Sequence, residues 1–225
     1  ESKGPDTCMT DQKIQLVDPN QPDPADIERA GKIIAAGGVV IFPAKCLYGV
    51  AADACDPMAV EKVFTLKRRP LNNPILVLVP GRDHLSALVK SIPETAACLM
   101  DAFWPGNLTL VFDAQDHLPA VLTAGTGKIG IRVPIHPVAR ALVRYLDRPV
   151  TGTSANLSGQ AGCSSAAQLD PSLLQMADMV LDAGPLKGGK GSSIVDVTGP
   201  VPRILREGEV LEHQIKTALA RQNHR

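Results

Sequence analysis

Apolar positions recur along the chain in two patterns, one with helical spacing and one with the short runs typical of buried strands. Apolar side chains at helical spacing follow Asp23-Pro24 and stop at Gly37-Gly38. An aspartate before a proline supplies a helix N-cap and then a first-turn residue that has no N–H to satisfy. The same Asp-Pro start recurs at 56–57, and the helical pattern after it continues to Lys67. Each Asp-Pro pair therefore predicts the start of a helix.

Short apolar runs bounded by turn residues predict strands. The predicted strands cover residues 39–42, 75–79, 108–112, 129–133, 179–181, 193–197 and 203–205, with a possible short edge strand at 14–17. Further helical patterns lie at 85–89, 94–103, 138–146 and 212–221. Strands and helices therefore alternate, which favours an α/β fold.

The alternation continues without a clear linker or internal repeat, so we expect one α/β domain. At 225 residues the chain is long enough for a sizeable core. We predict a polar N-terminal extension at 1–22, a main domain at 23–210 and a C-terminal helix at 211–225.

Charge and cysteine content narrow the class of protein. The 23 basic residues are balanced by 23 acidic residues, which argues against coating nucleic acid through net charge. The five cysteines show no Cys-x-x-Cys spacing, and the five histidines show no metal-binding spacing. Free thiols fit a reducing compartment. The most apolar run, 33–44, is too short to span a bilayer. We expect a cytoplasmic protein with no membrane association.

Two polar stretches stand out from this scaffold. The first, residues 66–74, places Lys67, Arg68 and Arg69 where a helical pattern stops, directly before two prolines at 70 and 74. The second, residues 151–159, is rich in threonine, serine and asparagine. We call them the cationic segment and the hydroxyl–amide segment. Either one alone reads equally well as a solvated turn. Together they suggest that positive charge and hydroxyl and amide groups meet across one cleft for an anionic ligand.

Two familiar chemistries are less favoured. Residues 184–191 nearly match a phosphate-binding loop, but Gly191 stands where a hydroxyl is needed and a predicted strand follows instead of a helix. Cys46 lies in a loop after a predicted strand, yet the sequence reveals no base that would activate it as a nucleophile. We interpret Cys46 as a structural or substrate-lining residue.

Several motifs together resemble one family. They are Phe42-Pro43 with Tyr48-Gly49, Lys67-Arg68-Arg69-Pro70 with Asn73-Pro74, Trp104-Pro105-Gly106, Ile131-Arg132-Val133-Pro134 with His136-Pro137, residues 154–159, Ser192 to Asp196, and Leu205-Arg206-Glu207-Gly208. In this order the chain resembles the short form of the YrdC-type threonylcarbamoyl-AMP synthases, from about Gly37 to Gly208. The resemblance implies a single YrdC-like domain, with a twisted mixed sheet and flanking helices around a basic concave cavity.

The resemblance also implies an activity. Such an enzyme, a nucleotidyltransferase, joins ATP, bicarbonate and L-threonine into threonylcarbamoyl-AMP and releases pyrophosphate, the first step toward threonylcarbamoyladenosine in tRNA. Mg²⁺ would accompany ATP with few protein ligands. Downstream tRNA-modification enzymes are the expected partners. Direct contact with RNA or tRNA is not required and stays open.

By the same resemblance, each candidate residue takes a role. Lys67 and Arg69 would be catalytic. The nucleotide would contact Lys67, Arg69, Asn73, Asn156, Ser164 and Arg206. The amino-acid substrate would contact Cys46, Arg132, Ser154 and Ser192.

The chain departs from the family pattern at a few positions. Ala44-Lys45-Cys46 replaces a usual Thr-Glu/Asp-Thr, Leu78 replaces a histidine found in some members, and Lys128 replaces a frequent threonine. Because the last of those threonines touches the substrate, the amino-acid selectivity of this chain stays open. A related carbamoyl-adenylate enzyme with another acceptor is the nearest alternative. A non-catalytic RNA-binding or ribosome-maturation protein is the alternative from another class.

Overall fold

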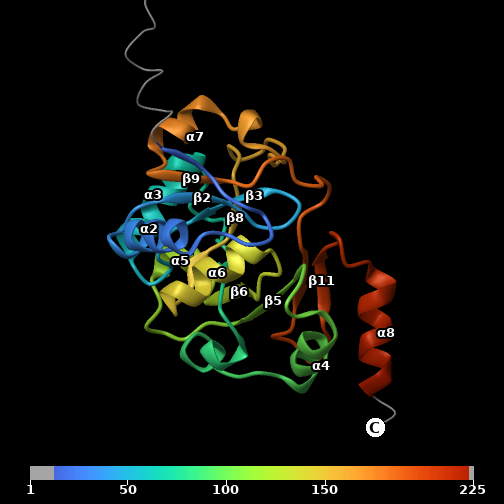
Figure 1. Cartoon of the computed structure of the whole chain (residues 1–225). Helices are drawn as coiled ribbons and strands as arrows, with labels where there is room; N and C mark the ends of the chain where they lie inside the picture. Colours follow the sequence, from blue (N-terminus) through green and yellow to red (C-terminus); the bar gives the residue numbers. More distant parts are fainter. Residues whose placement is uncertain (1–12, 223–225) are drawn as a thin grey trace, which may run out of the picture.

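The computed structural model describes residues 13–222, and its strands form two mixed sheets with helices around them (Figure 1). The predicted α/β fold is confirmed, with the strands divided between two sheets rather than gathered in one. Cys8 and the rest of residues 1–12, together with 223–225, lie outside the described residues.

The first sheet has five strands in the order β1-β9-β2-β3-β8. Strand β9 is parallel to both β1 and β2, whereas the pairs β2–β3 and β3–β8 are antiparallel. The bounds are β1 (Ile14–Leu16), β2 (Val40–Pro43), β3 (Tyr48–Ala51), β8 (Thr153–Ser154) and β9 (Met179–Asp182). The predicted edge strand at 14–17 is therefore confirmed as β1, so part of the predicted extension belongs to the sheet.

The second sheet has six strands in the order β11-β10-β5-β6-β4-β7. Its parallel pairs are β10 with β5 and β4 with β6, and the other three pairs are antiparallel. The bounds are β4 (Val77–Leu78), β5 (Leu108–Asp113), β6 (Lys128–Arg132), β7 (Val150–Thr151), β10 (Ser193–Asp196) and β11 (Arg203–Arg206).

Both Asp-Pro signals start helices as predicted. Asp23 Oδ1 accepts a hydrogen bond of 2.8 Å from the Ala25 amide, and Asp56 Oδ1 accepts one of 2.9 Å from the Met58 amide. The helices are α2 (Pro24–Ala35), α3 (Pro57–Lys67), α4 (Glu94–Phe103), α5 (Ala120–Thr123), α6 (Pro137–Leu146), α7 (Pro171–Met176) and α8 (Glu212–Gln222), with 3₁₀ turns at Arg82–Ala87 and Ala166–Gln168. Within residues 13–222, no helix combines the length and apolar character that crossing a membrane requires.

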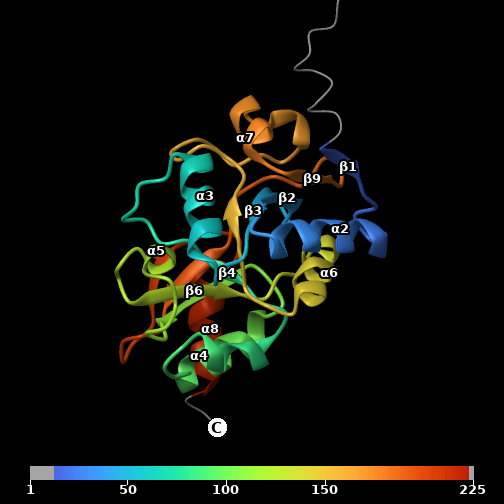
Figure 2. The same ribbon diagram turned by 90° about the vertical axis from the view of Figure 1, so that its left-hand side faces the viewer.

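The helices pack in pairs around two hydrophobic cores. Helices α2 and α6 lie side by side, as do α4 and α8, and α3 contacts both α5 and α7 (Figure 2). Strand β2 contributes to both cores, because Ile41 belongs to the larger cluster and Val40 and Phe42 belong to the smaller one. Alternate side chains of a strand point to opposite faces, so a strand buried on both faces reads as one continuous apolar run.

Some predicted elements differ from the structure. The strand predicted at 75–79 is reduced to the two residues of β4, and the helical pattern at 85–89 forms a 3₁₀ turn that ends at Ala87. Strand β3 and the short helices α5 and α7 were not predicted. Two of the four residues of β3 are a glycine and an alanine, which carry little strand signal by themselves. Its strand conformation is stabilised by hydrogen bonds to β2.

Candidate functional site

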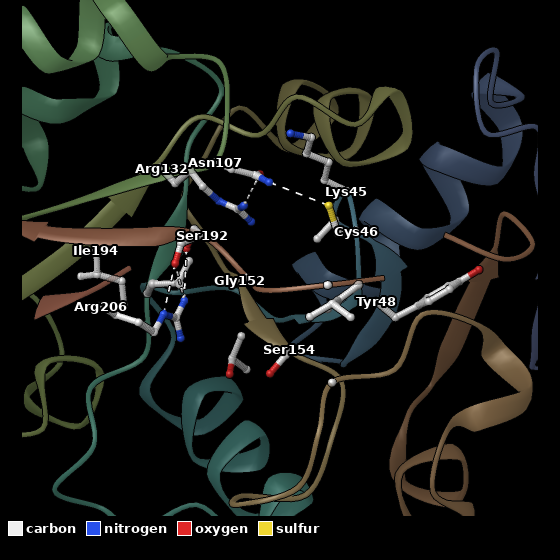
Figure 3. Close-up of a pocket in the computed structure, with 18 of the residues that line it drawn as sticks. Lys45, Cys46, Tyr48, Asn107, Arg132, Gly152, Ser154, Ser192, Ile194 and Arg206 are labelled. Atoms are coloured by element: carbon white, nitrogen blue, oxygen red, sulfur yellow. Dashed lines mark hydrogen bonds between the residues drawn. The ribbon is translucent and has the colours of Figure 1, made fainter. Parts of the chain in front are cut away.

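A pocket of about 480 Å³ opens between the two sheets, where strands, loops and the cationic segment converge (Figure 3). Its wall comes from the β2–β3 turn, the ends of β6, β8 and β10, the 189–192 loop and β11. This volume lies in the range of small-molecule sites. The site residues predicted from sequence that line it are Cys46, Arg69, Arg132, Ser154, Ser192 and Arg206.

Lys67 joins the two polar segments. Helix α3 ends at Lys67 because Arg68 adopts the left-handed conformation (φ 49°) that closes many helices. The Lys67 side chain is 1% exposed, and its ammonium donates hydrogen bonds to the carbonyl oxygens of Ser154 and Asn156, the latter at 2.7 Å. The prediction that the cationic and hydroxyl–amide segments meet is therefore confirmed.

The ammonium of Lys67 is held in an unfavourable electrostatic environment. Burial lowers its pKa from 10.5 to about 8, and the nearby positive charge of Arg69 adds to the effect. Both of its acceptors are backbone carbonyls, which carry no formal charge. Among the described residues no carboxylate pairs with this ammonium, so Lys67 contributes positive potential behind the pocket wall.

The Arg69 side chain lines the pocket and is held there by hydrogen bonds to backbone carbonyls of the 73–74 segment. Its Nε donates to the Asn73 carbonyl at 3.0 Å and its Nη2 to the Pro74 carbonyl at 2.8 Å. Asn73 thus supports Arg69 through its backbone, whereas its own side chain is exposed and absent from the pocket wall. Burial lowers the pKa of Arg69, although a guanidinium stays protonated in proteins.

Ser154 and Asn156 form one local hydrogen-bonded unit. The Ser154 hydroxyl donates to Asn156 Oδ1, and Asn156 Nδ2 donates to the Leu157 and Gln160 carbonyls at 2.7 and 2.8 Å. Ser154 lines the pocket, but Asn156 is buried behind it and shapes the loop. The short polar side chains here satisfy backbone groups that regular secondary structure would otherwise pair.

Arg132 ends strand β6 and is 6% exposed. Its Nη1 donates to Asn107 Oδ1 at 3.1 Å, whereas its Nε is buried and has no acceptor within residues 13–222. Burial lowers the pKa of Arg132 to about 10, and repulsion from Arg206 is the next cause. A buried guanidinium with an unsatisfied N–H is poised to bind an anion, because leaving such a group unpaired costs free energy.

Arg206 and Ser192 form the wall beside Arg132. Arg206 donates to the Ser192 carbonyl from Nε at 3.1 Å and from Nη2 at 2.7 Å. The Ser192 hydroxyl lies 2.9 Å from the Thr109 hydroxyl. In Figure 3, Ser192 lies between Arg206, below it in the view, and the Arg132–Asn107 pair, above it.

Cys46 is held as a thiol. Its sulfur donates to the carboxylate of Glu209, and burial together with that carboxylate raises the pKa of Cys46 to about 11. A thiol of this kind is a poor nucleophile at neutral pH, which agrees with the interpretation of Cys46 as a residue of the pocket wall. Lys45 beside it forms an ion pair of 2.9 Å with the same Glu209.

Ser164 lies apart from the pocket. Its amide donates to Gln168 Oε1 at 2.8 Å, and its carbonyl accepts from the Leu186 amide at 2.7 Å. The structure thus brings six of the candidate residues to the wall, places Lys67 and Asn156 directly behind it, and leaves the side chains of Asn73 and Ser164 outside it.

The sequence reasoning missed Asn107 and Glu209. Asn107 follows the Trp104-Pro105-Gly106 turn, and Glu209 follows Arg206-Glu207-Gly208, so each adjoins a recognised motif. Adjacency to a motif was the only available signal, because their contacts join segments about one hundred residues apart.

The pocket wall has a marked bias in its charged groups. Four lining residues are cationic, namely Lys45, Arg69, Arg132 and Arg206, and within the described part of the chain no aspartate or glutamate lines the pocket. Residues 13–222 also contain no cluster of three or more His, Cys, Asp or Glu side chains able to hold a metal ion. The arrangement suits a ligand that brings phosphate or carboxylate groups.

The comparisons with known proteins agree with this geometry. The Sua5–YciO–YrdC family model, described as "Telomere recombination", matches residues 32–208. The chain belongs to this family. The match covers all the motifs from Phe42-Pro43 to Gly208, so the resemblance seen in the sequence is confirmed.

Individual relatives in the Sua5–YciO–YrdC family cover most of the chain. A protein of Mycobacterium tuberculosis named "Putative threonylcarbamoyl-AMP synthase" is 38% identical over 206 residues, which are 92% of this chain and 94% of that protein. A Pyrococcus abyssi protein named "Threonylcarbamoyl-AMP synthase" is 34% identical over 193 residues, 86% of this chain and 57% of the relative. The chain thus spans little more than half the length of that Sua5–YciO–YrdC relative.

A solved structure of the same family shares the fold. The crystal structure of P. abyssi Sua5 complexed with L-threonine superposes with a TM-score of 0.85 at 32% sequence identity and covers 91% of this chain and 60% of that chain. The Sua5–YciO–YrdC fold is therefore present over nearly the whole described chain.

Proposed function

We propose that this chain makes L-threonylcarbamoyladenylate and pyrophosphate from ATP, bicarbonate and L-threonine. The observation that carries the proposal is the pocket wall, where Arg69, Arg132 and Arg206 converge with the Ser154 and Ser192 hydroxyl groups and where no aspartate or glutamate of residues 13–222 lines the pocket. Relatives named as threonylcarbamoyl-AMP synthases and a relative solved with L-threonine support the same assignment.

Arg132 is the proposed anchor for the amino acid. A guanidinium binds a carboxylate through two parallel N–H donors, and the buried Nε of Arg132 is without an acceptor among the described residues. Ser192 and Ser154 would orient the rest of the amino acid. The amine of L-threonine and bicarbonate would condense to a carbamate with loss of water.

Arg69 and Arg206 are the proposed contacts of the phosphates. The carbamate oxygen would attack the α-phosphorus, the bond from that phosphorus to the bridging oxygen would break, and pyrophosphate would leave. Negative charge increases on the departing pyrophosphate, and fixed cations near it stabilise the transition state. Lys67 would act from behind the wall through its charge and by holding the backbone of Ser154 and Asn156.

Mg²⁺ would enter with ATP. No acidic side chain of the described chain lines the pocket, so phosphate oxygens and water would supply the ligands, as is usual for this ion. The bound ion would neutralise phosphate charge, and Arg69 and Arg206 would add to that neutralisation.

The amino-acid dependence of pyrophosphate release tests the proposal. Purified protein is supplied with ATP, Mg²⁺ and bicarbonate, and pyrophosphate is measured across a panel of L-amino acids with D-threonine as a stereochemical control. We expect release that requires both bicarbonate and an L-amino acid, with L-threonine preferred. Pyrophosphate release that does not depend on the amino acid would refute the proposal.

A related enzyme with another acceptor is the second candidate, because Cys46 lies on the pocket wall where the family usually has threonine. Faster pyrophosphate release with an amino acid other than L-threonine would favour this candidate.

In either case the unstable adenylate would pass to a downstream enzyme that modifies tRNA. The four described cysteines are all free thiols, which fits our proposal of a cytoplasmic location.

A further inference from the structure

Glu209 accepts hydrogen bonds from three residues of the pocket wall although it does not line the pocket itself. Its Oε2 accepts from Lys45 Nζ at 2.9 Å and from Asn107 Nδ2 at 2.6 Å, and its Oε1 accepts from Cys46. Burial opposes ionisation, but these three hydrogen bonds together lower the pKa of Glu209 below its usual value. Glu209 is therefore an ionised group that only accepts hydrogen bonds.

This acceptor determines how the Asn107 amide is oriented. A side-chain amide has a donating –NH₂ end and an accepting oxygen. Because Glu209 can only accept, the –NH₂ of Asn107 must face it, and the amide oxygen then points the other way. That oxygen accepts from Arg132 Nη1 at 3.1 Å. In the opposite orientation, Asn107 would present its –NH₂ to a guanidinium and two donors would repel each other.

Asn107 is the one hydrogen-bond acceptor that the described chain offers to the Arg132 side chain. Both residues are at least 94% buried, so water competes little with this contact. The contact between Asn107 and Arg132 is drawn in Figure 3. The orientation of Arg132 in the pocket therefore depends on the Asn107 amide, whose own orientation depends on Glu209.

We propose that Glu209 is a positioning residue that acts through Asn107 to hold the Arg132 guanidinium in the orientation that binds the carboxylate of the amino-acid substrate. The substrate part of this inference rests on the proposed function. The structural part, the link from Glu209 to Arg132, does not.

Lys45 provides the competing explanation for an effect of Glu209. Its ion pair with Glu209 joins the β2–β3 turn to the segment after β11. If this ion pair alone mattered, the negative charge of Glu209 would be essential and the orientation of Asn107 would be irrelevant. Lys45 is 39% exposed in this pair, so solvent screens the attraction.

Two substitutions at one position separate these explanations. Glu209→Gln keeps an oxygen that can accept from Asn107 and Lys45, turns its –NH₂ toward the Cys46 sulfur, and loses the charge. Glu209→Ala removes the acceptor altogether. We expect L-threonine affinity, measured by calorimetry, to fall about tenfold in Glu209→Ala and to stay within about threefold of wild type in Glu209→Gln.

A double-mutant cycle with Arg132→Met tests whether the effect passes through Arg132. If it does, adding Glu209→Ala to Arg132→Met weakens binding no further. Additive losses, or equal losses in Glu209→Gln and Glu209→Ala, would overturn the proposal. Thermal unfolding of every variant shows that each one is folded.

NMR of the Arg132 Nε–Hε group provides a readout that needs no substrate. We expect this resonance to move in Glu209→Ala and to stay close to its wild-type position in Glu209→Gln. An unmoved resonance in Glu209→Ala would overturn the link between Glu209 and Arg132. Absence of L-threonine binding by the wild-type protein would instead overturn the substrate part, together with the proposed function.

Discussion

Replacing Lys67 by methionine removes a buried ammonium while keeping a side chain of similar length. The wild-type ammonium bonds the carbonyls of Ser154 and Asn156 and is 1% exposed. Because its pKa is lowered from 10.5 to about 8, the folded protein binds the Lys67 proton less tightly than the unfolded chain does. The unfolding free energy of the wild type should therefore rise with pH between these two values.

The size of the change in unfolding free energy follows from the pKa shift of Lys67. One pKa unit corresponds to about 1.4 kcal/mol, and between about pH 7.5 and about pH 9.5 the Lys67 contribution grows by about 2 kcal/mol. The neutral amine that forms keeps two N–H groups for the two carbonyls. Methionine does not titrate, so the stability of wild type relative to Lys67→Met should increase by that amount over this pH range.

Urea unfolding of both proteins at a series of pH values measures this difference. Lys62→Met is the matched control, because Lys62 is an exposed lysine of the same helix whose ammonium also bonds a backbone carbonyl, that of Gly37. Lys62→Met shows what the loss of an exposed lysine–carbonyl bond from the same helix does under the same conditions. A difference between wild type and Lys67→Met that does not change with pH would refute the reasoning that burial holds the Lys67 ammonium in an unfavourable state.

Three further predictions concern other parts of the site. Arg132→Met should raise the KM for L-threonine about a hundredfold, because a buried bidentate contact with a carboxylate is lost; an unchanged KM in the pyrophosphate assay would exclude Arg132 as the anchor. Gly208→Ala should lower the unfolding free energy by about 2 kcal/mol or more, because the added Cβ would lie 2.1 Å from the Gly191 carbonyl oxygen. Gly199→Ala is the control in urea titrations, because the nearest atom to its added Cβ would be 3.9 Å away. Equal losses of unfolding free energy in the two variants would contradict the clash. The pKa of Cys46 is raised to about 11, so its thiol should react slowly with iodoacetamide at neutral pH and faster as the pH approaches 11. Peptide mass spectrometry measures the extent of reaction, and half-maximal reactivity near pH 9 would show an unperturbed thiol.

The helix starts could be predicted from the sequence because their signals are local. An Asp-Pro pair supplies its cap within three residues, and Asp23 and Asp56 both act in this way. The division into two sheets could not be predicted in the same way. Strands β4, β7 and β8 have only two residues each, so their hydrogen bonds depend on partners distant in sequence rather than on their own pattern.

The site also contains residues that local motifs predicted and residues whose roles depend on contacts between distant segments. The motifs pointed to Arg69, Arg132, Ser154, Ser192 and Arg206, all of which line the pocket. They could not show that Lys67 is buried behind the wall, because a run of basic residues at a helix end reads as a solvated surface. Asn107 and Glu209 carry no motif of their own. Their importance emerges only when three segments come together around one carboxylate.

The fate of labelled bicarbonate tests the central claim most directly. The protein is incubated with ATP, Mg²⁺, L-threonine and ¹³C-bicarbonate, and the products are identified by mass spectrometry. We predict an adenylate that contains threonine and one labelled carbon, formed together with pyrophosphate. Turnover of ATP to an adenylate that lacks the label or threonine, or no adenylate at all, would contradict the assignment of this pocket.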